Sequence, residues 1–305
     1  MSMVHVLANP TAGRGHGPDT LTSITDALRA LGADPVLVDA PTRASVVGVV
    51  QRAVDDGATR LVVVGGDGLV HLAAQVLAST KVALGLVPVG TGNDFARALQ
   101  IPTGRERAIE HALGEPVAID AMRTNHGWIA SVGTIGFSAA VNARANRLRH
   151  PRGRARYTIA TLRELPALRP LPVRITVDGA VRECELALAA IANTRFFGGG
   201  MAVCPHADPT DGHLDVALVG AVGRATLLRF LPRVFRGTHT SHPAVTMLTG
   251  RRIRIELTDE GGRVARDAGL WGDGESVGAL PVDIEVVPQA LHVAGVHLSH
   301  ATGPA

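Results

Sequence analysis

The segment Leu61 to Gly68 constrains this chain most, because a buried strand there runs directly into a glycine-rich turn and a helix. Four apolar residues precede Gly65-Gly66-Asp67-Gly68, and the helical pattern of Leu69 to Leu77 follows. Glycine lets a backbone approach a ligand closely, and the N–H groups at a helix start favour anions. The turn therefore suits a phosphate or a metal ion beside Asp67, and it equally suits a plain tight connection.

Two more glycine-bearing corners have the same form. The apolar run Val82 to Val89 predicts a strand, and Gly90-Thr91-Gly92-Asn93-Asp94 follows it, with Asp94 placed as the N-cap of a short helix. The predicted strand Val4 to Ala8 leads into Asn9-Pro10-Thr11-Ala12-Gly13, which alone is also an ordinary loop. Successive parallel strands end at one edge of a sheet, so we expect one ligand to contact several corners.

The pattern of elements predicts two domains. Strands and helices alternate from residue 1 to about 120, which indicates an α/β domain with a parallel sheet. From residue 121 to 289, short strand-like runs separated by turns predict a mainly antiparallel β-sandwich. The strand-like runs are Trp128 to Val132, Val173 to Val177, Glu185 to Ala192, Leu214 to Val219, Arg252 to Leu257 and Val282 to Val287. Residues 290–305 begin with an apolar stretch that is expected to return to the first domain.

Composition excludes several classes of protein. An apolar fraction of 46% in 305 residues, with 35 Gly and 18 Pro, indicates a globular α/β protein and not a disordered chain. Cys184 and Cys204 are expected to be reduced core residues. The few apolar residues before Asn9 do not form a signal peptide, and no run is long enough to span a membrane, so we expect a soluble cytoplasmic protein.

The single lysine, Lys81, narrows the possible nucleotide sites. A P-loop requires a lysine directly after its second glycine, and a protein kinase requires a strand lysine near a glycine-rich loop. Lys81 stands in neither context. Phosphates would therefore be held by backbone N–H groups, arginine side chains or a metal ion.

Six motifs, in order and spacing, resemble one family. They are Asn9 to Gly13, Gly65 to Gly68, Gly90 to Arg97, Phe197 to Pro205, Asp211 to Val216 and Asp273-Gly274-Glu275. The sequence resembles the diacylglycerol kinase catalytic-domain family of lipid kinases, which includes bacterial diacylglycerol kinases and sphingosine kinases. The resemblance covers nearly the whole chain. It implies an α/β nucleotide-binding domain of the NAD kinase and diacylglycerol kinase type, a β-sandwich domain for the lipid acceptor, and an active site in the cleft between them.

The resemblance also implies the site residues and the cofactors, ATP and Mg²⁺. Asp67 is expected near the phosphates, acting through magnesium. The implied nucleotide contacts are Asn9, Pro10, Thr11, Ala12, Gly13, Thr42, Gly65, Gly66, Asp67, Gly68, Gly90, Thr91, Gly92, Asn93 and Asp94.

Asp273-Gly274-Glu275 supplies the general base in this scheme, with Glu275 in that role and Asp273 assisting. Without the resemblance, the segment is a polar turn between strands. A lipid hydroxyl becomes a good nucleophile when a carboxylate takes its proton. Two acids two residues apart in an extended segment point the same way, so the pair is predicted to act on one site.

A structural magnesium site is implied at Asp208, Asp211 and His213, because some bacterial members bind the ion at these positions. Asp211 would use its carboxylate and His213 its backbone carbonyl. An ordinary β-turn at Asp211-Gly212 explains the same residues.

The turn after Asp67 departs from the pattern of many members. Leu69 replaces a threonine, and His71 and Leu72 replace an Asn-Glu pair; leucine and histidine there also look like the sphingosine kinase variant. The hypothesis is an ATP-dependent lipid kinase that phosphorylates diacylglycerol to phosphatidic acid. A kinase for a sphingoid or other lipid alcohol and a catalytically silent nucleotide-binding member stay open as alternatives.

A basic stretch suggests the partner. Residues Arg144 to Arg156 include six Arg and one His with no acid. It predicts a solvated basic face or peripheral contact with the anionic inner membrane surface, where the lipid substrate would lie. Aromatic residues make up 3% of the chain, too few for stacking on nucleic acid. A homodimer stays open.

Overall fold

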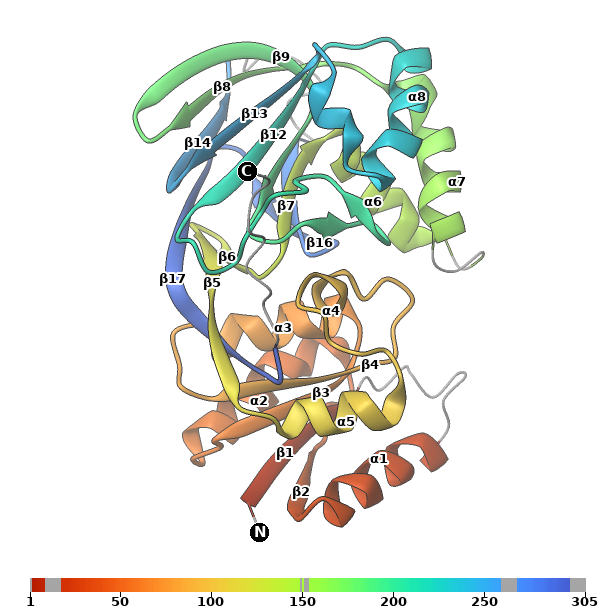
Figure 1. Ribbon diagram of the computed structural model, residues 1–305. Helices are drawn as coiled ribbons and strands as arrows, with labels where there is room; N and C mark the ends of the chain where they lie inside the picture. The colour runs from red at the N-terminus through yellow and green to blue at the C-terminus, as the bar shows by residue number, and fades with distance from the viewer. Residues whose placement is uncertain (1, 9–17, 149, 151–153, 259–267, 297–305) are drawn as a thin grey trace, which may run out of the picture. The chain divides into compact units, whose positions relative to one another are not determined.

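The computed structural model describes residues 2–8, 18–148, 150, 154–258 and 268–296 (Figure 1). The chain divides into two compact units, residues 1–118 with 291–305 (unit 1) and residues 119–290 (unit 2). It passes from one unit to the other within strand β5 (Pro116–Thr124) and again within strand β17 (Val282–Ala294). Among the described residues, no helix has both the length and the apolar character needed to cross a bilayer.

Unit 1 is built on a parallel sheet. Its strands lie in the order β2, β1, β3, β4, and the end of β17 adds in parallel beside β4, with His292 opposite Ala83. The strands with bounds not yet given are β1 (Ser2–Ala8), β2 (Ala33–Val38), β3 (Arg60–Gly65) and β4 (Ala83–Pro88). The central strands β3 and β4 are almost continuously apolar and buried, as expected when helices cover both faces.

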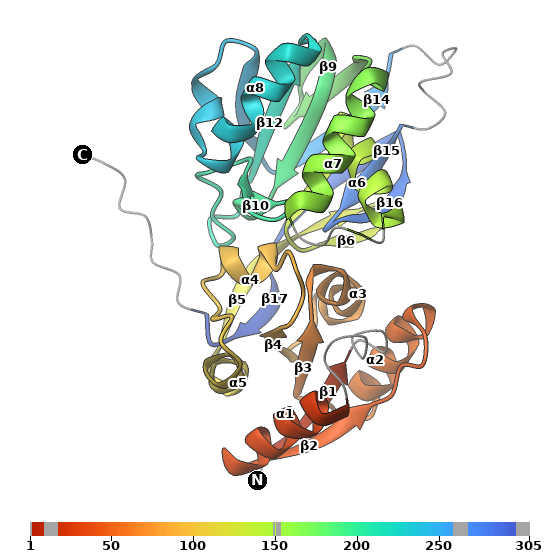
Figure 2. The ribbon, with the colours of Figure 1, turned by 90° about the vertical axis from the view of Figure 1, so that its right-hand side faces the viewer.

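Helices cover both faces of this sheet (Figures 1 and 2). Helices α1 and α5 share one core with alternate residues of β1 and β3, whereas α2 and α3 contact each other on the opposite face. The helices of unit 1 are α1 (Pro18–Ala30), the 3₁₀ turn η1 (Arg43–Ser45), α2 (Val46–Asp55), α3 (Asp67–Leu77), α4 (Asp94–Ala98) and α5 (Arg105–Leu113). The predicted α/β domain is confirmed.

Unit 2 is an antiparallel, sandwich-like β structure. Strand β9 (Ala180–Ala192) pairs with β8 along its first half and with β7 and β12 along its second half. The other strands are β6 (Gly127–Ile129), β7 (Val132–Gly136), β8 (Leu171–Val177), β10 (Phe196–Phe197), β11 (Met201–Ala202), β12 (Leu214–Gly220), β13 (Val245–Gly250), β14 (Arg252–Leu257), β15 (Gly269–Gly272) and β16 (Glu275–Ala279).

The core of unit 2 joins both halves of this strand arrangement. Ile135, Ile175, Ile191, Val216 and Ile284 come from five strands and belong to one buried cluster. The predicted mainly antiparallel sandwich is therefore confirmed. Both cysteines are free thiols, as expected; Cys204 is fully buried, whereas Cys184 is only partly buried against the core.

The single strand predicted over Trp128 to Val132 is wrong. The structure has two strands, β6 and β7, separated at Ala130 and Ser131. The backbone N–H groups of these two residues donate to the carboxylate of Asp273, at 2.9 and 2.8 Å. The strand is interrupted there because Asp273, which is far away in the sequence, accepts these two hydrogen bonds.

A helical layer covers one side of the unit 2 sheet (Figure 2). It consists of α6 (Phe137–Arg147), α7 (Arg154–Glu164), the 3₁₀ turn η2 (Leu165–Ala167) and α8 (Arg224–Phe235). Val141, Ala160 and Phe230, one from each helix, pack in the same buried cluster as Ala187 of β9 and Val219 of β12. The layer is therefore held to the sheet by an apolar core of its own.

His239, in the 3₁₀ turn η3 (Thr238–Ser241), makes the stability of unit 2 depend on pH. The residue is 1% exposed, and its Nε2 lies 3.0 Å from the Val203 carbonyl oxygen. Burial lowers the pKa of His239 below its ordinary value of 6.5, and the hydrogen bond to Val203 only partly opposes this. The unfolded chain therefore takes up the proton first as the pH falls below that value.

We expect the unfolding free energy to fall as the pH drops from 7 through the ordinary histidine pKa toward the lower folded-state pKa. Urea unfolding at pH values across this range measures the effect. His239→Gln, whose amide can still donate to Val203, should show a shallower decline, and an equally steep decline in this variant would contradict the assignment.

Candidate active site

The two glycine corners of unit 1 lie side by side because β3 and β4 are parallel neighbours. Gly65 pairs with Pro88 at their carboxyl ends, and the Val89 N–H donates to the Gly65 carbonyl at 3.0 Å. Asp67, the first residue of α3, then joins the corners, since its Oδ1 accepts from the Phe95 backbone N–H at 3.0 Å. A ligand at the start of α3 would therefore meet residues of both loops.

Glycine is required where the corners touch. A Cβ on Gly90 would lie 2.7 Å from the Gly66 Cα and 2.6 Å from the Asn93 Oδ1, closer than real Cβ contacts. On Gly92, a Cβ would lie 2.9 Å from Asp67 Oδ2 and 3.9 Å from Asp94 Oδ2. The space over Gly92 is thus flanked by two carboxylate oxygens, which are the ligands that a hard cation such as Mg²⁺ prefers.

Gly90→Ala is expected to lower both stability and nucleotide affinity. The added methyl group must displace the Gly66 backbone, and overpacking of this kind costs about 1–3 kcal/mol of unfolding free energy. Gly104→Ala is the matched control, because no atom lies within 4 Å of its added Cβ. Urea unfolding and calorimetric titration with ATP would show a loss in the first variant only; equal behaviour of the two would mean that the corners do not need this close approach.

The predicted N-cap of α4 is wrong by one residue. Asn93 occupies the N-cap with a left-handed φ of 52°, and its Nδ2 donates to the Gly90 carbonyl at 2.9 Å. Asp94 is instead the first residue of the helix, 7% exposed and ion-paired with Arg97 at 2.8 Å. Asparagine tolerates the left-handed region, so the tight turn selects it for this position.

The Thr42 loop lies next to the α3 corner. Thr42 caps η1 through a reciprocal hydrogen-bond pair with Ser45, and the neighbouring Arg43 Nη2 lies 3.5 Å from the Gly68 carbonyl oxygen. An exposed arginine beside the Gly66 to Gly68 turn was not singled out from the sequence. Its only sequence signal is its position directly after Thr42.

The predicted contacts Asn9 to Gly13 lie outside the described residues. Strand β1 leads to them, and its last residue, Ala8, pairs with Val64 of β3. The chain thus leaves β1 beside the Gly65 corner.

In unit 2, Asp273 and Gly274 form the tight turn between β15 and β16. Both have positive φ, 53° and 83°, which is the signature of a two-residue hairpin turn of type I′. The Asp273 carboxylate holds the Ala130 and Ser131 N–H groups, and Asn146 Nδ2 donates to the Gly274 carbonyl at 2.9 Å. The segment before Glu275 is therefore anchored by three other residues of unit 2, Ala130, Ser131 and Asn146.

The expectation that Asp273 and Glu275 point the same way rested on an extended backbone, and that premise is wrong. Asp273 lies in the left-handed turn, and only Glu275, the first residue of β16, is in a strand. Both carboxylate oxygens of Asp273 accept backbone hydrogen bonds. Asp273 is thus suited to positioning the turn, and Glu275 stays the predicted base.

Comparison with known proteins identifies the family. Residues 3–124 match the diacylglycerol kinase catalytic domain, and residues 130–295 match the YegS C-terminal NAD kinase beta sandwich-like domain. A diacylglycerol kinase of Mycobacterium tuberculosis is 36% identical over 298 residues, covering 95% of this chain and 94% of that protein. The chain belongs to the diacylglycerol kinase family. It is therefore a lipid kinase.

More distant relatives of this lipid kinase extend over the same length. A diacylglycerol kinase of Bacillus subtilis is 26% identical, with 96% of each chain covered. The crystal structure of a diacylglycerol kinase from Bacillus anthracis superposes with a TM-score of 0.72 at 22% identity, covering 96% of both chains. The latter comparison shows that the fold is shared.

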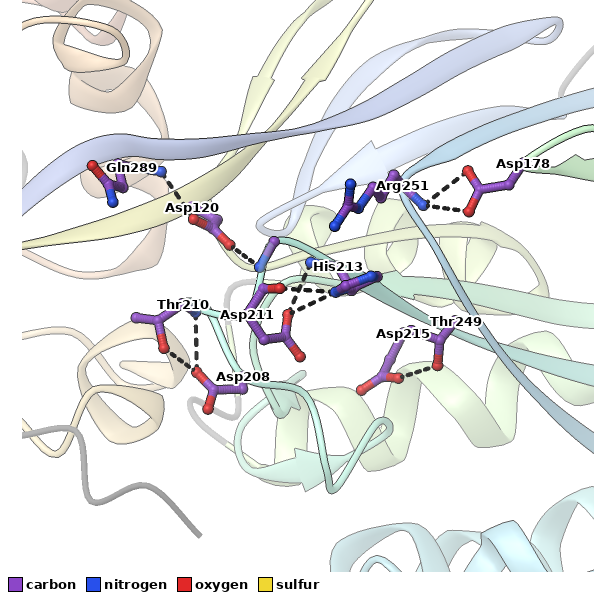
Figure 3. Close-up of polar contacts among 11 residues, drawn as sticks. Asp120, Asp178, Asp208, Thr210, Asp211, His213, Asp215, Thr249, Arg251 and Gln289 are labelled. Atoms are coloured by element: carbon purple, nitrogen blue, oxygen red, sulfur yellow. Dashed lines mark hydrogen bonds and ion pairs between the residues drawn. The ribbon is translucent and has the colours of Figure 1, made fainter.

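The lipid kinase holds Asp208, Asp211 and His213 in a compact turn (Figure 3). Asp208 Oδ1 accepts from the Thr210 N–H and hydroxyl, and Asp211 Oδ1 accepts from the His213 N–H at 2.8 Å. Within the part of the chain that the structure describes, no three His, Cys, Asp or Glu side chains are grouped to hold a metal ion. The predicted ligand set includes a backbone carbonyl, and the magnesium site stays a prediction.

Asp120 is a polar residue that the motifs did not reveal. It is 1% exposed, and its carboxylate accepts from the Gly212 N–H at 2.8 Å and the Gln289 N–H at 2.9 Å (Figure 3). Burial raises the pKa of Asp120, the two N–H groups oppose this, and the charges of Asp211 and Asp208 raise it further. Its only sequence signal is an acid within the otherwise apolar residues 116–122 of β5.

The residues that depart from the family pattern lie in α3. Leu69 and His71 are buried and Leu72 is partly buried. His71 is 8% exposed, so it is a packed helix residue. Leu72, which stands where many members carry a carboxylate, puts an apolar side chain there.

Proposed function

We propose that this lipid kinase is an ATP-dependent diacylglycerol kinase, which transfers the γ-phosphoryl group to the free hydroxyl of diacylglycerol and forms phosphatidic acid. The observation that carries the proposal is the joined pair of glycine corners, closed by the Asp67 to Phe95 hydrogen bond at the start of α3. The names of the relatives, including the one from Mycobacterium tuberculosis, support diacylglycerol as the first choice of acceptor.

The nucleotide's phosphates would bind the backbone N–H groups at the start of α3, where the helix dipole favours negative charge. Gly65 to Gly68 and Gly90 to Asp94 would line this subsite, together with Thr42 and Asn9 to Gly13. The two carboxylate oxygens that flank Gly92, from Asp67 and Asp94, fit a magnesium ion. When bound, the ion would neutralise charge on the phosphates.

On the acceptor side, Glu275 would serve as the general base, with the Asp273 turn fixing its position. The hydroxyl oxygen attacks the γ-phosphorus, its proton passes to the Glu275 carboxylate, and ADP leaves with the electrons of the broken P–O bond. Binding of the apolar acceptor would also keep water out of the site. The electrostatic contacts of Glu275 would be stronger as a result.

An apolar cavity in unit 2 supports a lipid acceptor. It has a volume of about 80 Å³ beneath α6, α7 and α8. Its lining includes Phe137, Tyr157, Leu188, Leu227, Phe230 and Leu231. Ser138, Asn142, Thr161 and His239 also line it, but most of the lining is apolar and suits a hydrocarbon chain.

Radiolabelled ATP with a panel of lipids in mixed micelles tests the proposal. Labelled product is expected with diacylglycerol, migrating as phosphatidic acid. Product formed only with sphingosine would favour the sphingoid alternative, which the Leu69 and His71 pair motivates. Measurable ATP binding with no product from any lipid would favour the silent alternative, which the apolar Leu72 motivates, and would overturn the proposed function.

A further inference from the structure

The charges of this chain are strongly segregated. The segments 137–169 and 224–236, which contain α6, α7 and α8, hold twelve of the 30 basic residues and only one of the 27 acidic residues, Glu164. The remainder of the chain has 18 basic and 26 acidic residues. The sequence of net charge +3 therefore concentrates its positive charge in these two segments, and the rest of the sequence is net negative.

Eight of the arginines of this layer are exposed, whereas Arg156 of α7 is only partly exposed. We call the eight exposed arginines the arginine face: Arg144, Arg147, Arg163, Arg169, Arg224, Arg229, Arg233 and Arg236. Helices α7 and α8 lie on the same side of the unit 2 sheet and both face the viewer in Figure 2. Arg224 Nη2 donates to the Pro166 carbonyl at 2.5 Å, which ties the start of α8 to the turn after α7. Two helices distant in sequence thus form one basic surface.

Exposed leucines stand among these arginines. Leu162 is 51% exposed beside Arg163 on α7, and Leu228 is 37% exposed beside Arg229 on α8. On α8 the opposite side, with Leu227 and Phe230, is buried against the layer's core. Arginine and leucine together on an outward helix side are typical of helices that lie on a membrane surface.

We propose that the arginine face, with Leu162 and Leu228, docks the protein onto an anionic lipid bilayer. Arginines would contact the lipid phosphates while the two leucines enter the headgroup boundary. The acidic remainder of the chain is repelled by the same surface, so the charge segregation also orients the protein. A nucleic acid would use the arginines but has no complement for exposed leucines, and the chain lacks aromatic residues for base stacking. This docking goes beyond the proposed function and does not rest on it.

Sedimentation with vesicles tests the docking without any catalysis. The full chain is mixed with vesicles of phosphatidylcholine alone or with added phosphatidylglycerol, at low and at high salt. Binding is expected only to the anionic vesicles and is expected to weaken with salt. Arg229→Glu with Arg233→Glu should weaken it by roughly thirtyfold or more, because each arginine near an anionic surface contributes about fivefold.

Matched variants separate the surface from net charge. Arg105→Glu with Arg107→Glu changes the charge equally on α5, and Leu31→Gln alters a leucine that is 50% exposed in unit 1. Both should bind like the unchanged protein, whereas Leu162→Gln should bind several-fold more weakly. Circular dichroism checks the folding of each variant.

Three results would overturn the proposal. The first is equal loss of binding in the α5 and α8 charge variants, and the second is equal binding to neutral and anionic vesicles. The third is displacement of the protein from vesicles by a duplex nucleic acid whose own binding is lost in the α8 variant, because the face would then be a nucleic-acid site.

Discussion

Asp67→Asn is expected to lower turnover by about a thousandfold, the order of effect seen when an electrostatic group that acts in a transition state is removed. The thermal unfolding temperature should change little. An asparagine oxygen can still accept the Phe95 N–H, so the bond between the two corners survives while the negative charge of Asp67 is lost. Initial rates with saturating ATP and diacylglycerol, together with a thermal melt, measure both quantities.

Asp55→Asn on α2 is the matched control, because this exposed carboxylate accepts a hydrogen bond from Gln51 that an asparagine oxygen can also accept. It should retain normal turnover. Magnesium titration of the Asp67→Asn variant adds a second readout, since a weaker dependence on the ion is expected if Asp67 acts through it. Near-normal turnover with normal magnesium dependence would remove Asp67 from the catalytic scheme.

Local sequence signals were sufficient to predict the two glycine corners of unit 1. Apolar runs ending in glycine predicted β3 and β4, because a buried parallel strand and a turn that needs close backbone approach each leave a direct mark in the sequence. The adjacency of the corners followed from the rule for parallel strands. The hydrogen bond that joins the two corners, from the Phe95 N–H to Asp67, could not be predicted from any local sequence pattern.

Details set by distant partners could not be read from the sequence. The break between β6 and β7 depends on Asp273, more than a hundred residues away, and the buried position of Asp120 depends on Gly212 and Gln289. The prediction that Asp273 and Glu275 point the same way also failed. It assumed the alternating side chains of a strand, whereas Asp273 lies in a tight turn. Pattern rules describe local geometry, whereas these positions are fixed by tertiary hydrogen bonds.

The arginine face also could not be read in full from local sequence patterns. The stretch Arg144 to Arg156 was evident as a charge run, whereas the arginines of α8 are spaced along an ordinary amphipathic helix. Only the fold brings α7 and α8 to one side of the unit 2 sheet. The charge run thus identified Arg144 and Arg147 of the arginine face, and the topology supplied the rest.

Glu275→Gln is expected to lower turnover by about a hundredfold to ten-thousandfold, which is the range that a positioned general base contributes. Glutamine has the same shape but cannot accept the hydroxyl proton. The hairpin should persist, because the bonds that hold it come from Asp273 and from Asn146 to Gly274. Initial rates across pH, with ATP binding measured separately, check that the loss lies in turnover and not in nucleotide affinity.

Asp273→Asn distinguishes the two acids of this turn. One of its side-chain oxygens becomes an NH₂ group facing a backbone donor, so the Ala130 or Ser131 N–H loses its acceptor and the loop should loosen. Its loss of turnover should therefore come with a lower unfolding temperature, whereas Glu275→Gln should lose turnover at an unchanged one. If Glu275→Gln keeps normal turnover while Asp273→Asn loses it without destabilisation, then the base is Asp273 and its two backbone hydrogen bonds must open before the acceptor's proton can be taken.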